Sequence, residues 1–348
     1  MYRKSVTLLV VGLTALGLAS WLCAAEGAAP SKGEPSKAPA AKAPAPRPTE
    51  EPDDGIQGLY VGTLGGAKAE ARVIGLKDKT YKVILTSGEG ASAVKVELNG
   101  KLESGKVVLA GVAGETGTIA DKKLTGEAKG AKFELTYTVP KSPTEGAKPP
   151  AGAIVLLAFE PGKAPSLDAW SDMKGGPALW VPQDDGSILV KGGNIKTKKD
   201  FTNVRLHVEF RCPYMPAGTG QGRGNSGVYL QSRYEVQVLD SFGLATKDNE
   251  CGGIYSVSAP KVIASFPPGV WQTYDITFRA PKVADGKIVE PAVASVVHNG
   301  VTIHENVKID HVTTAGVAGP IVSPAPLMLQ DHGNPVRYRN IWLEELKD

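Results

Sequence analysis

The sequence has little cysteine, little excess charge and only one long apolar run. Three cysteines among 348 residues exclude a disulfide-rich scaffold and the common zinc modules with four ligands. The 39 basic and 36 acidic side chains leave a formal charge of +3, too small a surplus for a nucleic-acid-binding surface. Hydrophobic residues make up 42% and charged residues 22%, which excludes a polytopic membrane protein and a wholly disordered chain. The length leaves room for two domains.

The single long apolar run lies at the N-terminus and predicts an export signal over residues 1–25. Arg3 and Lys4 precede the apolar stretch Val6–Leu22, and Cys23–Ala25 offers small residues for cleavage. An uncleaved membrane anchor is the alternative, because the run is close to the shortest stretch that spans a bilayer. Lipid attachment at Cys23 is a further alternative, against which the bulky Trp21 argues. We therefore expect export to the periplasm or cell envelope, with membrane contact only through an uncleaved signal or a lipid anchor.

Residues 26–54 are rich in Ala, Pro, Lys and Glu, a composition that cannot bury enough apolar surface to fold, and they predict a disordered linker. Cleavage after Ala25 leaves Cys212 and Cys251 as the two thiols of the exported chain. In an oxidising compartment these thiols either form one disulfide or remain two small buried residues, and the sequence leaves both open.

Two further regions show the two-residue period of β-strands and no helical period. In residues 55–140, short alternating runs broken by glycine predict a small antiparallel β domain, as in Tyr81–Leu85 and Phe133–Tyr137. This region has no His and no Cys, so a spacer or binding role is expected of it. Residues 141–153 are rich in Pro and Gly and predict a linker to the larger region, residues 154–348.

The larger region predicts a two-sheet β-sandwich of the jelly-roll type. Val204–Cys212 alternates without a fault between an apolar and a polar face. Asn299 and Gly300 predict a tight hairpin, beside which we expect His298 to be exposed. Many short strands, turns rich in Gly and Pro, and the lack of a long helix are typical of this architecture.

Two stretches carry polar side chains in patterns that ordinary solvent exposure does not explain. In the first, Gly222–Gln231 followed by Tyr234–Ser241, the side chains of Glu235 and Gln237 project from one face of one strand. Carboxylate, amide and tyrosine groups together suit sugar hydroxyls, which both donate and accept hydrogen bonds. The second, Leu327–Asn334, gathers polar side chains at a strand end, where scaffolds commonly carry function.

These residues resemble the 3-keto-disaccharide hydrolase family over about Ile154–Leu346. The resemblance implies a concanavalin A-like (lectin/glucanase) jelly roll that acts on glycosides oxidised at C3, by hydrolysis or by a lyase and hydratase pair. The opening Ala158–Gly162 departs from the Leu-Phe-Asp-Gly-Lys that is usual in the family. The motifs that agree are Arg223–Gln231, Tyr234–Ser241, Glu250–Tyr255, Trp271–Asp275 and Leu329–Trp342.

The implied reaction needs a base for the C2 proton of the keto sugar, a donor for the enolate oxygen and an acid for the leaving group. We expect His332 or Glu235 to act as the base, with Asp331 orienting it or acting as the acid. His332 is a candidate because histidine titrates near neutral pH and has a carboxylate beside it in the sequence. The expected saccharide-binding side chains are Glu209, Arg211, Asn225, Tyr229, Gln231, Gln237, Asp240, Tyr255 and Gln330.

The expected partner is an oxidised (3-keto) saccharide or another glycan, with no nucleic acid and no cofactor. A divalent metal on His332 and Asp331 remains an alternative. The competing function is a non-catalytic, lectin-like carbohydrate-binding module, because fold alone does not give function. A structural envelope or adhesion protein is a third class.

Overall fold

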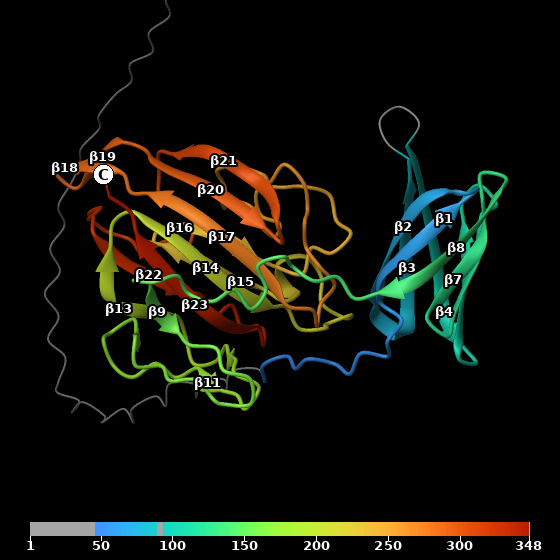
Figure 1. The fold of residues 1–348 in the computed structure, drawn as a ribbon, viewed down its shortest axis with the longest axis horizontal. Coiled ribbons are helices and arrows are strands. Elements are labelled where there is room, and N and C mark those ends of the chain that lie inside the picture. Colours follow the sequence, from blue (N-terminus) through green and yellow to red (C-terminus); the bar gives the residue numbers. More distant parts are fainter. Residues whose placement is uncertain (1–45, 89–92, 348) are drawn as a thin grey trace, which may run out of the picture. The chain divides into compact units, whose positions relative to one another are not determined.

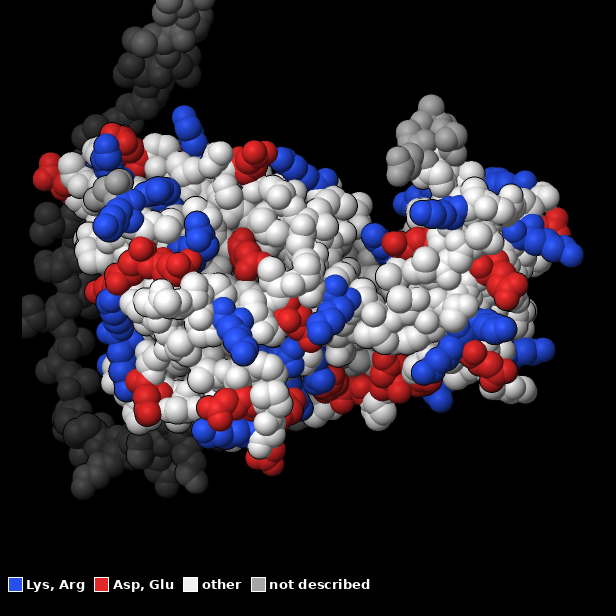
Figure 2. Space-filling view, viewed as in Figure 1, with Lys and Arg blue, Asp and Glu red and all other residues white. Residues whose placement is uncertain are grey.

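The structure is a computed structural model that describes residues 46–88 and 93–347. The predicted signal peptide and most of the first linker lie outside the described residues. Apart from two short 3₁₀ turns, Lys77–Lys79 and Gly220–Gly222, the regular structure there is β. Within the described residues, no helix is long and apolar enough to cross a membrane. The visible face in Figure 2 intersperses basic and acidic side chains, in keeping with the small net charge.

The first eight strands form a closed antiparallel barrel, in which each strand pairs with the next and the last pairs with the first. Alternate side chains such as Tyr60, Val83 and Leu135 fill its interior, and the intervening ones face outward. Closure removes the open edges that a small sheet would otherwise expose. The strands are β1 (Gly58–Leu64), β2 (Ala67–Leu76), β3 (Thr80–Ser87), β4 (Val94–Glu103), β5 (Lys106–Gly111), β6 (Thr116–Ala120), β7 (Lys123–Ala128) and β8 (Ala131–Thr138).

The following region is a β-sandwich of two antiparallel sheets (Figure 1). The five-stranded sheet has the order β10 (Trp170–Asp172), β13 (Ile195–Phe201), β22 (Ala325–Leu329), β15 (Ser226–Leu230) and β16 (Tyr234–Val238). The larger sheet has the order β11 (Val181–Pro182), β12 (Ile188–Leu189), β23 (Arg337–Glu345), β14 (Val204–Arg211), β17 (Gln272–Arg279), β20 (Ala292–His298) and β21 (Val301–Ile309), with β9 (Ile154–Leu157) paired to β23. A small ribbon, β18 (Lys282–Ala284) with β19 (Lys287–Glu290), completes the region.

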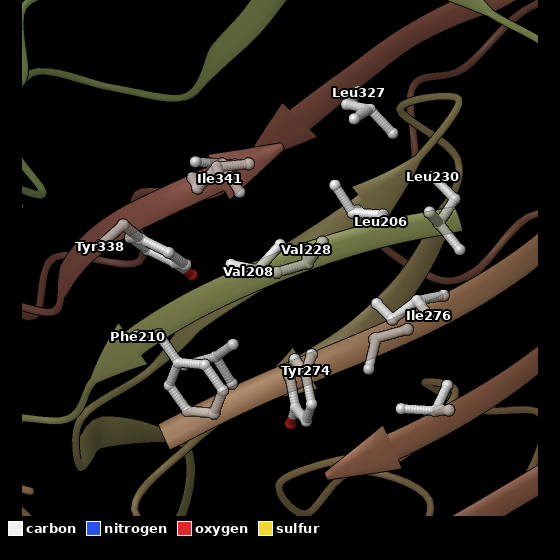
Figure 3. Packing of buried hydrophobic residues seen from close by; sticks show 14 of the residues in the cluster. Leu206, Val208, Phe210, Val228, Leu230, Tyr274, Ile276, Leu327, Tyr338 and Ile341 are labelled. Atoms are coloured by element: carbon white, nitrogen blue, oxygen red, sulfur yellow. The ribbon is translucent and has the colours of Figure 1, made fainter. Parts of the chain in front are cut away.

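The core between the two sheets follows the alternation of the sequence (Figure 3). Leu206, Val208 and Phe210 of β14 point into it and meet Val228 and Leu230 of β15. Because successive strand residues point to opposite faces, the residues between these are directed to the outer faces of the two sheets. The predicted all-β sandwich is confirmed, and polar side chains such as Glu209 on β14 and Glu235 on β16 lie on its outer faces.

Two local features test the sequence expectations directly. The hairpin between β20 and β21 turns at Asn299 and Gly300, both with positive φ, as predicted. The expectation that His298 is exposed is wrong: it is fully buried, its Nε2 lies 3.0 Å from Gln272 Oε1, and burial lowers its pKa to about 3. Cys212 and Cys251 are both free and buried in the sandwich core.

Candidate active site

The outer face of the five-stranded sheet carries a compact polar group, here called the Glu235 cluster: Tyr229, Glu235, Gln237 and Gln330. In β15 and β16 the apolar residues face the core, so Tyr229, Glu235 and Gln237 face outward. Tyr229 lies directly opposite Glu235 in the antiparallel register. Gln330 directly follows β22, and its N–H donates to the carbonyl of Gly227 at 3.0 Å. The two polar stretches of the sequence therefore meet on one sheet face.

Hydrogen bonds connect the four side chains. Gln330 Nε2 donates to the Tyr229 hydroxyl at 2.9 Å, and that hydroxyl also interacts with the Glu235 carboxyl. The side-chain amide of Gln237 lies 2.8 Å from Glu235 Oε1. Gln330 Oε1 is buried without a partner in the described part of the chain. An unpaired buried acceptor of this kind suits a ligand hydroxyl.

Glycine at position 227 makes the arrangement possible. Gly227 pairs with Gln237 on the neighbouring strand, and the Glu235 side chain lies over it. A Cβ at this position would collide with Glu235 Oε1 and would lie 2.7 Å from Tyr229 Cε2. The small residue therefore leaves the space in which the carboxyl and the tyrosine ring meet.

Glu235 is a buried carboxyl without a cation. Only 2% of its surface is exposed, and no ion pair reaches it from residues 46–88 or 93–347. Burial raises the pKa of the Glu235 carboxyl to about 7, and the bond from Tyr229 offsets this only in part. A carboxyl that titrates near neutral pH can accept or release a proton under physiological conditions.

A glycine-rich turn borders the cluster. Gln221, on the turn Gly220–Gly222, accepts from Asn225 Nδ2 at 3.0 Å and lies 2.9 Å from the Gln237 amide. Gln221 Nε2 in turn donates to the carbonyl of Asn249 at 2.7 Å. Asn225 is thus a neighbour of the cluster, held by its N–H bond to Asn334 Oδ1. The sequence analysis did not single out Gln221, although its place among four glycines was a usable signal.

Asp331 and His332 differ from the roles expected of them. Asp331 accepts from Arg47 at 2.8 Å and from the N–H groups of Gly193 and Gly333. Burial opposes ionisation, but these donors outweigh it and lower the pKa of Asp331. His332 is exposed and makes no hydrogen bond or ion pair with other described residues. Asp331 therefore orders its loop as an anion, and its interactions do not orient His332.

The remaining candidates on this half of the sandwich make contacts that order the backbone. Asp240 pairs with Arg223 at 2.6 Å, and both are buried. Gln231 lies in the turn after β15 and donates to the carbonyl of Phe201 and to Ser323. Tyr255 is half-buried, and its N–H donates to the carbonyl of Glu235 at 3.2 Å.

Glu209 and Arg211 lie on β14, so the structure separates them from the Glu235 cluster onto the outer face of the other sheet. Glu209 bonds with Arg339 at 2.7 Å and with Asn340 at 2.8 Å, and its Oε1 is 3.5 Å from His207 Nε2. Arg211 pairs with Glu50 at 2.9 Å. Within the described ranges, no group of three or more His, Cys, Asp or Glu side chains is arranged to hold a metal ion.

The match to a family model bears on the sandwich. Residues 153–344 match the model of the family described as 3-keto-alpha-glucoside-1,2-lyase-like domain. The chain belongs to this family. A solved structure of a predicted glycosyl hydrolase from Parabacteroides distasonis ATCC 8503 is similar to it, with 36% identity and a TM-score of 0.51, over 56% of this chain and 84% of that one. A second structure from the same organism, likewise described as a predicted glycosyl hydrolase, has 21% identity and a TM-score of 0.39, over 52% and 90%. No curated protein matches the chain.

Proposed function

We propose that this member of the 3-keto-alpha-glucoside-1,2-lyase-like family is a carbohydrate-active enzyme that cleaves the glycosidic bond of 3-keto-glycosides at the Glu235 cluster. Family membership and the likeness to a predicted glycosyl hydrolase support a saccharide substrate. The observation that carries the assignment of the site is the Glu235 carboxyl, which is buried, has no cationic partner among the described residues and has a pKa of about 7.

The proposed reaction starts at C2 of the keto sugar, whose proton is acidic because the carbonyl at C3 delocalises the resulting carbanion. Glu235 as carboxylate takes this proton, and the electron pair of the C–H bond forms the enolate. When the enolate collapses to the ketone, the electron pair forms the C1–C2 double bond and the bond from C1 to the glycosidic oxygen breaks. The departing oxygen receives the proton that Glu235 now holds. Water then adds to the C1–C2 double bond, so the net result is hydrolysis.

Tyr229 and Gln330 are placed to assist this step. The Tyr229 hydroxyl adjoins the Glu235 carboxyl, and Gln330 Nε2 bonds to the same hydroxyl. Donors already held in position stabilise charge that develops on an enolate oxygen without reorganising during the reaction. Because Glu235 and Tyr229 are buried, access of a saccharide requires an opening of the residues that border the cluster.

The test is the assay of Glu235→Gln on a 3-keto-glucoside beside its unoxidised parent. We expect kcat/KM to fall by about 10²–10⁴-fold, the contribution of a general base. In the unsubstituted enzyme kcat/KM should rise with pH through about 7, because the base acts as carboxylate. Glu290→Gln, at an exposed position on β19, is the matched control and should keep full activity. Full activity of Glu235→Gln would remove the assignment.

A lectin-like binding module is the second candidate function, because the sandwich fold by itself does not distinguish binding from catalysis. Binding of intact glycans with no turnover of any 3-keto sugar would support it over the enzyme.

Export is part of the proposal and rests on the apolar run of residues 1–25. Mass spectrometry of the mature protein tests it, and an N-terminus beginning at Met1 would contradict cleavage.

A further inference from the structure

The outer face of the larger sheet carries a second polar group, which is independent of the Glu235 cluster. We call it the β14 cluster and define it as His207, Glu209, Asp275, Arg339 and Asn340. His207 Nδ1 lies 2.6 Å from Asp275 Oδ1, and Glu209 Oε2 accepts from Arg339 Nε at 2.7 Å. His207 and Glu209 are 1% and 0% exposed, although both point away from the sandwich core.

A short segment of the linker, residues 142–147, covers this face. We call it the strap. Nearly every residue of the strap offers a polar atom to the sheet, through two hydroxyls, one carboxylate, one N–H and one carbonyl. These contacts are Ser142 Oγ to Thr273 Oγ1 at 2.6 Å, Thr144 Oγ1 to Asp275 Oδ2 at 2.8 Å, Glu145 Oε1 to Arg339 at 2.9 Å, Gly146 N to Glu209 Oε1 at 2.6 Å, and the carbonyl of Ala147 to Asn340 Nδ2 at 2.9 Å and Trp342 Nε1 at 3.3 Å.

A gain in stability does not by itself explain why charged side chains are buried under the strap on this sheet face. Burying paired charges costs several kcal/mol of desolvation per ion, and apolar side chains of similar volume often serve stability equally well. Here a linker is held by two carboxylates, a guanidinium and an amide, which are groups suited to a polar ligand.

The strap lies outside the family domain. The family match begins at residue 153, whereas the strap ends at residue 147. All five side chains of the β14 cluster lie inside the matched residues. The cluster thus belongs to the domain, and its cover comes from the segment that precedes the domain in this chain.

Aromatic rings frame the cluster. The guanidinium of Arg339 lies 4.0 Å from the centre of the Trp271 ring and 4.3 Å from that of Phe159. Trp342 stacks on His207 at 5.0 Å. Rings beside hydrogen-bonding groups give a surface for the apolar faces of a sugar next to partners for its hydroxyls.

From these contacts we propose that the β14 cluster is a binding site for a saccharide that carries a carboxylate, and that the strap occupies this site in the structure. The ligand carboxylate takes the place of Glu145 on Arg339. Its hydroxyls take the places of the Ser142 and Thr144 hydroxyls and of the Gly146 N–H. The strap competes as a tethered ligand, so the site binds free saccharide tightly only when the strap is displaced.

Gly146→Pro displaces the strap without changing any side chain of the sheet. Gly146 has φ of +76°, which proline cannot adopt, and proline lacks the N–H that Glu209 accepts. The matched control is Gly152→Pro, which also replaces an exposed linker glycine with positive φ, at +84°, but one with no bond to the cluster. Glu145→Gln is a second variant, which removes only the carboxylate that the strap contributes to Arg339.

The probes are cellobiouronic acid and neutral cellobiose, titrated into the full chain by calorimetry. We expect Gly146→Pro and Glu145→Gln to bind cellobiouronic acid at least about tenfold more tightly than the unsubstituted chain and Gly152→Pro. The Glu235→Gln substitution should leave the affinity for cellobiouronic acid unchanged, which distinguishes this site from the proposed catalytic site. Two results would overturn the proposal. One is an unchanged affinity for cellobiouronic acid in a variant whose amides at residues 142–147 are shown by hydrogen exchange to have opened. The other is an equal gain in affinity for cellobiose.

Discussion

The two outer faces of the sandwich each bury one outward-pointing glutamate, and the two glutamates differ in their partners. Glu235 on β16 has uncharged neighbours, and burial raises its pKa to about 7. Burial acts in the same direction on Glu209 on β14, but His207, Asn340, the Gly146 N–H and Arg339 outweigh it and lower its pKa. Equal burial therefore gives a carboxyl that exchanges protons near neutral pH on one sheet and a carboxylate that is ionised at neutral pH on the other.

The difference separates two kinds of site. A base for proton abstraction needs a pKa near the working pH, which burial provides at Glu235, where no cation among the described residues offsets it. A carboxylate that anchors hydroxyl or amide donors needs to stay ionised, and the bonds from His207, Asn340, Gly146 and Arg339 favour this form at Glu209. The chemistry of each face is thus set by the residues around the glutamate.

Removal of the Glu209 side chain should have the largest effect on stability. Glu209→Ala leaves the buried Arg339 without this partner, and we expect the free energy of unfolding to fall by about 3–5 kcal/mol. Glu344→Ala, which breaks the exposed pair with Arg205, is the control and should cost at most about 1 kcal/mol. Urea unfolding at pH 7 measures both, and equal losses would show that the Glu209 network is not coupled as described.

Neutralising Glu235 should have the opposite effect. A carboxyl whose folded-state pKa is about 7 costs stability as pH rises above its ordinary value of 4.5, and the full cost is reached above 7. Glu235→Gln should therefore stabilise the fold by about 3 kcal/mol at pH 8 and hardly at pH 4.5. Unfolding curves of Glu235→Gln and the exposed Glu305→Gln at both pH values test this. A gain that does not depend on pH would contradict the raised pKa.

Much of the fold follows from local pattern, and less of the site does. The alternation in Val204–Cys212 and the Asn299–Gly300 turn set their strands and hairpin directly. Closure of the barrel depends on pairing β1 with β8, a contact between distant segments that no local pattern encodes. His298 is buried because the rings of Phe210 and Tyr274 pack on it, which a hairpin signal does not report.

Long-range pairing, which local pattern does not encode, also explains why only part of the predicted site comes together in the structure. Alternation placed Glu235 and Gln237 on one face, and the structure agrees. It also set Glu209 and Arg211 on the polar face of their strand, but it could not show that this strand belongs to the other sheet. Sheet membership is fixed by long-range pairing, so the separation of the two glutamates emerges only in three dimensions.

A methyl group at position 227 should disturb the Glu235 cluster and lower activity less than Glu235→Gln does. Gly227→Ala places a Cβ against the Glu235 carboxyl and the Tyr229 ring, so the base moves from its bond with Tyr229. We expect kcat/KM to fall by about 10–100-fold, with a shift in the apparent pKa of the pH profile. Gly222→Ala is the control, since a Cβ there meets nothing within 4 Å. An unchanged pH profile in Gly227→Ala would show that Glu235 is not the titrating group.

The smallest effect is expected at His332. Its side chain is exposed and bonds with no described residue, and Asp331 is committed to Arg47, Gly193 and Gly333. His332→Ala should therefore change kcat/KM by no more than about twofold, as should His311→Ala at another exposed histidine. A loss at His332→Ala as large as that of Glu235→Gln would move the role of base to His332. It would also end the contrast between the two glutamates as an account of catalysis, because the raised pKa of Glu235 would then serve no chemical step.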